Sequence, residues 1–270
     1  MTGVICSVSP ATDKETIMVG KLLMRGMLAG VVAGLIAFGF ARVAGEPQVD
    51  RAIAFEEHAH AMEGDAHEPE LVSRDTQAGP GLLTGVVAYG AAFGGLFALT
   101  FAWAWGRVGK LGARPLAAWL ALGAFVALVV VPNLKYPANP PSVGDPDTIG
   151  YRTGLFFLTI AISVAIMVLS LNVRSVAARR FGAWNGALAG LLAFVVMLAV
   201  VLAALPAIDE VPAAFPATLL WKFRIAAIGM QAVIWTTLGA LFGVLAERIG
   251  FADSRMRGDA RGASAATQAF

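Results

Sequence analysis

Residues 183–205 read AWNGALAGLLAFVVMLAVVLAAL and contain no Asp, Glu, Lys, Arg or His. A helix needs about 20 predominantly apolar residues to cross the hydrocarbon core of a bilayer. Backbone N–H and C=O groups find no water there, so such a segment must pair them internally as a helix. This stretch therefore predicts a transmembrane helix.

The composition of the whole chain supports this interpretation. Of the 270 residues, 58% are hydrophobic and 14% are charged, and the mean hydropathy is +0.73. Soluble domains average about 45–50% apolar and about 25% charged residues. The formal net charge of +2 is too small to suggest a nucleic-acid partner. The single cysteine, Cys6, excludes an internal disulfide.

Five further apolar runs resemble the first, so the chain is predicted to be an all-α, polytopic membrane bundle of six helices in contact with the lipid bilayer. The predicted helices cover residues 22–44, 81–105, 116–131, 153–171, 183–205 and 225–246. The predicted domain plan is a polar N-terminal extension at 1–20, a transmembrane domain at 21–249 and a disordered cytoplasmic tail at 250–270.

The basic residues predict the orientation of the bundle. They gather before the first run, after every second run and in the C-terminal tail, whereas the remaining connections hold most of the acids. Short cytoplasmic connections carry an excess of Lys and Arg. A six-helix protein of the cell membrane with both termini in the cytoplasm places all of these on one side: Lys14, Lys21, Arg25, Arg107, Lys110, Arg114, Arg174, Arg179, Arg180, Arg248, Arg255, Arg257 and Arg261.

Glycines and polar residues within the runs indicate how the helices pack. Gly26, Gly30 and Gly34 share one face of the first helix, and small residues let membrane helices approach closely. Such a face packs tightly or lines a narrow path. No Asp, Glu or His lies in the middle of any run, which argues against a proton-coupled pump. Gln231 is the most pore-like polar group, although an interhelical hydrogen bond would also explain it.

The connection between the first two helices carries all three histidines among carboxylates. Imidazole and carboxylate groups together suit borderline divalent ions such as Co²⁺, Ni²⁺ and Zn²⁺. His58 and His60 lack helical i, i+4 spacing, so a flexible external loop that collects ions is expected. The alternative is a solvated acidic loop with incidental histidines. The candidate metal ligands are His58, His60, His67, Glu56, Glu57 and Asp65, and the ion is a substrate rather than a permanently bound cofactor.

The second external connection is rich in proline and glycine, which fix a stiff, irregular path. Arg152 and Arg224 stand at outer helix ends, where acids of the external loops are available as partners. The prediction is a rigid outer vestibule; the alternative is that both arginines anchor helix ends by snorkelling. The candidate vestibule residues are Asn133, Lys135, Asn139, Asp145, Asp147, Arg152 and Arg224, with Gln231 as a candidate for the path beyond. The expected acidic partners are Asp145, Asp147, Asp209 and Glu210.

Several loop phrases together resemble one known family. The runs KYPANPP (135–141), GDPDTIG (144–150), FPA (215–217) and LWKFR (220–224) are similar to those of the CbtA family of probable cobalt transporter subunits. The resemblance covers about Gly20 to Ile249. It implies a role in cobalt uptake beside a small membrane partner, CbtB, that carries metal-binding histidines.

The leading hypothesis is therefore a membrane subunit of a divalent-metal uptake system, with cobalt as the expected ion. A P-loop, an HExxH motif and a GxSxG motif are all missing from the sequence, so the chain is expected not to be an enzyme. Two alternatives remain open: a non-transporting accessory or scaffold subunit, and a permease for another small solute.

Overall fold

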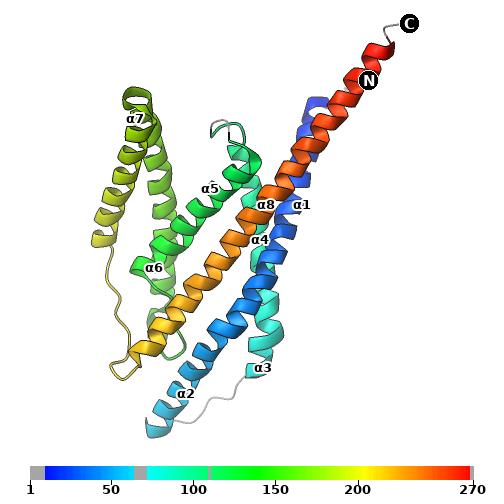
Figure 1. The fold of residues 1–270 in the computed structure, drawn as a ribbon. Coiled ribbons are helices and arrows are strands. Elements are labelled where there is room, and N and C mark those ends of the chain that lie inside the picture. Colours follow the sequence, from blue (N-terminus) through cyan, green and yellow to red (C-terminus); the bar gives the residue numbers. More distant parts are fainter. Residues whose placement is uncertain (1–9, 64–71, 109–110, 268–270) are drawn as a thin grey trace, which may run out of the picture. The chain divides into compact units, whose positions relative to one another are not determined.

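The computed structural model describes residues 10–63, 72–108 and 111–267. Within these ranges the regular structure is helical and contains no strand (Figure 1). Five of its helical segments are long and apolar enough to cross a membrane. The prediction of an all-α, multi-pass membrane fold is therefore confirmed.

The first helical segment extends far beyond its predicted end at residue 44. It runs without a break through α1 (Pro10–Phe40), the π-helical turn η1 (Ala41–Gly45) and α2 (Glu46–Glu63). A proline inside a helix removes one hydrogen bond and crowds the preceding turn. The wider turn η1 ends two residues before Pro47 and relieves this crowding. The helix thus continues through Pro47, beyond its predicted end at residue 44.

The third predicted helix, 116–131, is extended by the same device. Here α5 (Ala113–Phe125) leads into the π-helical turn η3 (Val126–Val130) and then into α6 (Val131–Lys135). Pro132 lies in the first turn of α6, where its missing N–H costs little because η3 has already changed the hydrogen-bond register.

The second predicted helix, 81–105, agrees closely with α4 (Leu82–Ala104). It is preceded by the short α3 (Arg74–Thr76) and by the π-helical turn η2 (Gln77–Gly81), which contains Pro80. All three π-helical turns in the described chain therefore contain a proline or end two residues before one.

The long helix α7 (Ile149–Ala204) is a hairpin of two arms. Its 56 residues are interrupted at Gly182, where φ is 85° and ψ is 165°. Glycine adopts a positive φ without steric cost, so the chain reverses there. The arms lie side by side (Figure 1), and a Cβ at Gly186 would lie 2.6 Å from the Ala178 Cβ. The two arms correspond to the predicted helices 153–171 and 183–205, so the five segments comprise six arms.

The last segment, α8 (Ala217–Thr267), follows an irregular connection and is much longer than the predicted helix 225–246. The structure continues the helix through residues 250–267, where the sequence analysis expected a disordered tail. Ala and Arg, which favour helices, are frequent in that stretch. A short 3₁₀ turn, η4 (Pro146–Thr148), precedes α7.

The chain forms two compact units. Unit 1 comprises residues 1–38, 79–122 and 233–270, and unit 2 comprises residues 39–78 and 123–232.

In unit 1, α1 and α4 meet backbone to backbone. Gly30 faces Gly90, Gly26 faces Gly94, and a Cβ placed on Gly34 would lie 2.8 Å from the carbonyl oxygen of Val86. The prediction that the glycine face of the first helix mediates close packing is confirmed. Such close packing holds the two helices together in lipid, where the hydrophobic effect between helices is weak.

Aromatic side chains fill the rest of unit 1. Phe97 and Phe101 of α4 contact Phe242 of α8 with ring centroids 5.3 and 5.0 Å apart. Two basic residues then fix the end of this unit: Arg25 donates to the Leu245 carbonyl at 2.5 Å, and Arg114 pairs with Glu247 at 2.6 Å. Residues from three of the four predicted cytoplasmic segments therefore lie together, as the six-helix topology requires.

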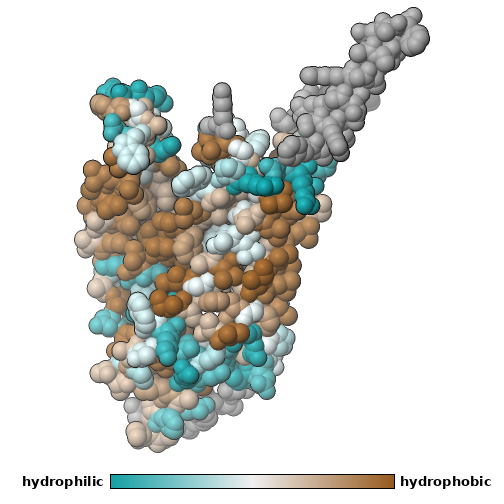
Figure 2. Space-filling view, in the orientation of Figure 1, coloured by the Kyte–Doolittle hydropathy of each residue, from teal (hydrophilic) through white to brown (hydrophobic). Residues whose placement is uncertain are grey.

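In unit 2, a small core ties α2 to the irregular connections and to the start of α8. Ala52, Val143, Phe215 and Leu219 are buried together, and the rings of Phe55 and Phe215 meet at 5.1 Å. The α7 hairpin behaves differently, because most of its large apolar side chains are exposed. Its arms are brown along their length and teal at the turn near Gly182 (Figure 2), a distribution that suits a lipid-facing hairpin.

Candidate functional site

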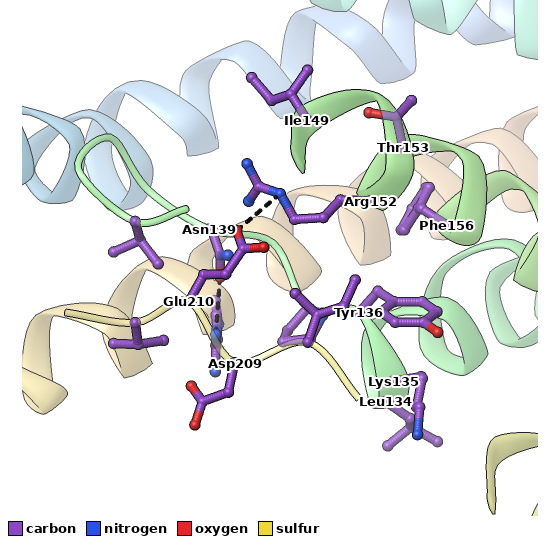
Figure 3. Close-up of a pocket in the computed structure, with 15 residues that line it drawn as sticks. Leu134, Lys135, Tyr136, Asn139, Ile149, Arg152, Thr153, Phe156, Asp209 and Glu210 are labelled. Atoms are coloured by element: carbon purple, nitrogen blue, oxygen red, sulfur yellow. Dashed lines mark hydrogen bonds and ion pairs between the residues drawn. The ribbon is translucent and has the colours of Figure 1, made fainter. Parts of the chain in front are cut away.

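A cavity of about 640 Å³ lies in unit 2, where the connections after α6 and α7 meet the first turns of α7 and α8 (Figure 3). Polar and apolar side chains both line it. The lining residues are Leu134, Lys135, Tyr136, Pro137, Asn139, Val143, Ile149, Arg152, Thr153, Phe156, Ile208, Asp209, Glu210, Val211 and Arg224.

The wall that follows α6 is fixed by short-range hydrogen bonds. Asn133 donates from Nδ2 to the Val129 carbonyl at 2.8 Å, and its Oδ1 accepts from the Ala138 amide at 3.2 Å. Asn133 thereby caps the helix and folds the next residues back across its end. Tyr136 donates to the Pro206 carbonyl at 2.9 Å, and burial raises the pKa of its phenol, which remains a donor.

Glu210 connects the two opposite walls of the cavity. Its carboxylate accepts from the Asp145 amide at 2.9 Å and from the Thr148 hydroxyl at 2.7 Å. The Arg152 Nε lies 3.2 Å from the same carboxylate. Figure 3 shows the two side chains facing each other, with the Asp209 carboxylate directed away from the pair.

The electrostatics of Glu210 follow from these contacts. The hydrogen bond from the Asp145 amide is the largest influence that lowers its pKa, followed by the Thr148 hydroxyl, with the charge of Arg152 adding to both. Partial desolvation opposes the shift but does not overcome it. Since hydrogen bonds to the ionised form favour that form, Glu210 holds the walls together as a carboxylate.

The two arginines of the predicted vestibule act differently. Arg152 pairs with Glu210 and also donates to the Asp145 carbonyl at 3.2 Å. Arg224 forms hydrogen bonds, donating to the Ala138 carbonyl at 3.3 Å and to the Asn139 Oδ1 at 2.9 Å. It thereby fastens the proline-rich wall to the first turns of α8.

The structure brings four of the seven predicted vestibule residues to the cavity itself: Lys135, Asn139, Arg152 and Arg224. The other three shape its walls. Asn133 caps α6 as described, and Asp145 accepts from the Asp147 amide at 2.9 Å to start η4. Sequence reasoning considered Glu210 only as an ion-pair partner. It missed Glu210's central position, because that depends on a backbone amide contributed 65 residues earlier.

The charges of the lining do not form a ready cation site. Arg152 and Glu210 offset each other, which leaves Lys135 and Arg224 against Asp209. Within residues 10–63, 72–108 and 111–267, no group of three His, Cys, Asp or Glu side chains could hold a metal ion. With three basic and two acidic side chains, the lining carries a net positive charge.

The histidine segment differs from its expected form. Glu56, Glu57 and His58 lie on α2, whose helix continues past His60 to Glu63, so a flexible loop is wrong for these residues. The run EEHAHAME contains no Gly or Pro and is rich in good helix formers.

The remaining candidate residues stay as predictions. Asp65 and His67 lie outside the described residues. Gln231 lies partly buried on α8, two turns beyond Arg224. Its Oε1 is buried, and no hydrogen bond reaches that atom within the described chain.

Comparison with known proteins adds one finding. The model of a family described as "Probable cobalt transporter subunit (CbtA)" matches residues 19–247. No curated protein and no solved structure matches the chain.

Proposed function

The chain belongs to the CbtA family of probable cobalt transporter subunits, and from this premise we propose that it is the membrane-embedded subunit of a Co²⁺ uptake system in the cell membrane. The family match over residues 19–247 carries the proposal of the cargo. The family description makes it a transporter subunit, which suggests a non-enzymatic role with partners in a membrane complex.

The cavity around Glu210 is the proposed outer vestibule. It lies at the ends of three helical segments, and its walls are joined by hydrogen bonds rather than by a closed apolar core. An entrance of this kind holds an ion only weakly, which conduction requires because a tightly bound ion leaves slowly.

The proposed route continues along α8. Arg224 lines the cavity, and Gln231 follows seven residues later on the same helical face, about 10 Å further along the axis. A buried amide oxygen without a partner is costly to leave unpaired. The Gln231 Oε1 is therefore the proposed first contact for an ion, with or without its water, beyond the vestibule.

Ion collection is assigned to the histidines and carboxylates between residues 56 and 67. His58 is disfavoured for this role, because Arg51 and Lys222 line the same groove and two positive charges repel a divalent cation. Collection by His60 and His67 requires neutral imidazole, so it should weaken as the pH falls through about 6.5. Co²⁺ is the substrate, with Ni²⁺ and Zn²⁺ as competitors.

A second chain completes the proposed system. The sequence contains no P-loop, so ATP-derived energy would have to come from a partner. A small membrane protein with metal-binding histidines, similar to CbtB, is the proposed partner.

Uptake of radioactive Co²⁺ at limiting concentration tests the proposal in cells that lack the gene, with the partner present throughout. Restoring the wild-type chain should raise the initial rate, and H60A/H67A should reduce it at low Co²⁺ but not at high Co²⁺. H58A is the matched control and should have the smaller effect. Equal Co²⁺ uptake with and without the chain would contradict the proposal and favour an accessory role. If the chain instead raised the uptake of another solute and left Co²⁺ uptake unchanged, it would be a permease for that solute.

Cysteine labelling tests the orientation in a C6S background, which removes the single native cysteine. With intact cells, an impermeant maleimide should modify S142C in the wall beside the vestibule and leave R179C at the α7 turn unmodified. Modification of R179C alone would reverse the topology and remove the vestibule from the outer side.

A further inference from the structure

A second hollow in unit 2, of about 460 Å³, lies between α2 and the start of α8 and is separate from the vestibule in its lining. Its apolar part consists of Ala54, Phe55, Pro216 and Leu219, and its polar part of Arg51, His58, Thr218 and Lys222. We call it the basic groove.

The apolar part of the basic groove is anchored in the core of unit 2. Leu219 is only 8% exposed, and Phe55 packs edge-on against Phe215 at 5.1 Å. Because this base is fixed, the groove is a formed feature rather than a gap between mobile side chains. It offers a supported apolar surface for a ligand with a hydrocarbon chain.

The charges of α2 are divided between two faces. Glu46 and Asp50 both pair with Arg74, which holds the two carboxylates away from the groove and offsets one of their two negative charges. Arg51 lies in the groove and donates to Gln48 at 3.3 Å. Within the described chain, neither Arg51 nor Lys222 forms an ion pair with an acid: the ion pairs there join Arg74, Arg114 and Arg152 to their partners.

The acids nearest in sequence also turn away from the groove. At 100° per residue, Arg51, Ala54, Phe55 and His58 fall on one face of α2. Glu56 and Glu57 are rotated from Arg51 by roughly 140° and 120° in opposite directions. The groove therefore combines two permanent positive charges and an imidazole with an apolar base.

The groove lies at headgroup depth in the proposed bundle. Leu219 and Lys222 precede the apolar run that begins at residue 225 by about 9 and 5 Å of helix rise. Trp221, between them, is 66% exposed, and exposed Trp is enriched where membrane meets water.

We propose that the basic groove binds an anionic phospholipid. Arg51 and Lys222 hold the phosphate group, His58 donates a hydrogen bond to it, and one acyl chain lies across Ala54, Phe55 and Leu219. Both halves of the ligand are required, because the base is apolar and the rim is positive. This role does not depend on the transported ion.

Native mass spectrometry of the purified full-length chain tests the proposal. Dioleoyl phosphatidylglycerol and dioleoyl phosphatidylcholine, which share acyl chains, are titrated separately. The wild-type chain should bind the anionic lipid more tightly, and R51Q/K222Q should weaken that binding by roughly 30-fold, as expected for the loss of two cations near a lipid phosphate. R179Q/R180Q loses the same charge at the α7 turn and should retain the wild-type affinity for the groove lipid.

A second variant tests the apolar half without changing charge. Ala54 is exposed in the groove, so A54W should fill it, preserve the fold and displace the lipid. Equal wild-type affinity for the two lipids, an equal loss in R179Q/R180Q, or full binding by A54W would each overturn the proposal. Displacement of the lipid by millimolar inorganic phosphate would also overturn it, because the groove would then be a site for a free anion.

Discussion

The α1–α4 contact of unit 1 and the vestibule of unit 2 are assembled by opposite means. Gly26, Gly30 and Gly90 allow two backbones to touch, and nothing fits between them. Around the vestibule, Glu210 and Arg224 span the walls through long side chains and leave about 640 Å³ open. Close backbone contact thus yields a scaffold, whereas side-chain bridges yield a space that can admit a solute.

The largest expected effect comes from adding one methyl group to the glycine contact. In G30A the new Cβ would overlap the Gly90 carbonyl, and neither backbone can move without shifting its helix. Overpacking of this kind costs about 1–3 kcal/mol, occasionally more. Thermal unfolding in detergent should show a clearly lower midpoint for G30A. G85A on α4, where nothing lies within 4 Å of the new atom, should match the wild type; equal midpoints for the two variants would break the comparison.

The next effect comes from removing the charge that joins the vestibule walls. E210Q loses the ion pair with Arg152 and weakens the hydrogen bonds from Asp145 and Thr148. Its unfolding midpoint should fall by less than that of G30A, and Co²⁺ uptake per folded molecule should fall as well. D209N is the matched control for the unfolding midpoint alone, because the Asp209 carboxylate is directed away from the Arg152–Glu210 pair (Figure 3). Unchanged Co²⁺ uptake in E210Q would show that the cavity takes no part in transport.

The pH dependence sharpens the contrast between the units. Glu210 has a pKa below its ordinary value of 4.5, so its ionised form contributes stability that is fully present above 4.5. That contribution is lost as the pH falls through the lower folded-state pKa. The midpoint difference between wild type and E210Q should therefore stay constant from pH 7 to about 5 and shrink below 4.5.

The difference in unfolding midpoint between wild type and G30A should not depend on pH in this way, because no titrating group takes part in the glycine contact. A pH-independent E210Q difference would show that the walls are held by shape rather than charge.

The smallest effect is expected at a hydrogen bond inside the bundle. Ser163 donates to the Ala127 carbonyl on the neighbouring helical segment, whereas Ser170 donates to Ile166 within its own helix. S163A should cost about 0.6 kcal/mol, the average for interhelical hydrogen bonds in membranes. S170A, equally buried, should be nearly neutral in the same unfolding assay. Equal losses would mean that the interhelical bond adds nothing to packing.

The sequence predicted helices well where the membrane imposes its own rule. Apolar runs such as 183–205 left no choice but a helix, and the second arm of α7 ends at Ala204. The ends of the helices were harder to predict, because this rule does not apply outside the hydrocarbon core. The first helix was expected to end at residue 44, but the π-helical turn η1 carries the helix past Pro47. A proline signals strain in the sequence, and only packing decides whether the helix breaks or widens.

The site was predicted by residue type and missed in its connections. Arg152 and Arg224 were identified as vestibule residues because arginines at outer helix ends need partners. Their separate roles could not be predicted, since Arg152 found Glu210 and Arg224 found the Ala138 carbonyl through folding of distant loops. His58 shows the reverse case: its neighbours Arg51 and Lys222 come from another segment and change the chemistry expected of it.

The sequence by itself determined that this chain forms helices long and apolar enough to cross a membrane, because lipid does not tolerate unpaired backbone groups. Only the tertiary structure decided which glycines touch, where the cavity opens and which carboxylate joins its walls. Those features depend on atoms brought together from positions such as Asp145 and Glu210, and no local pattern records a contact across 65 residues.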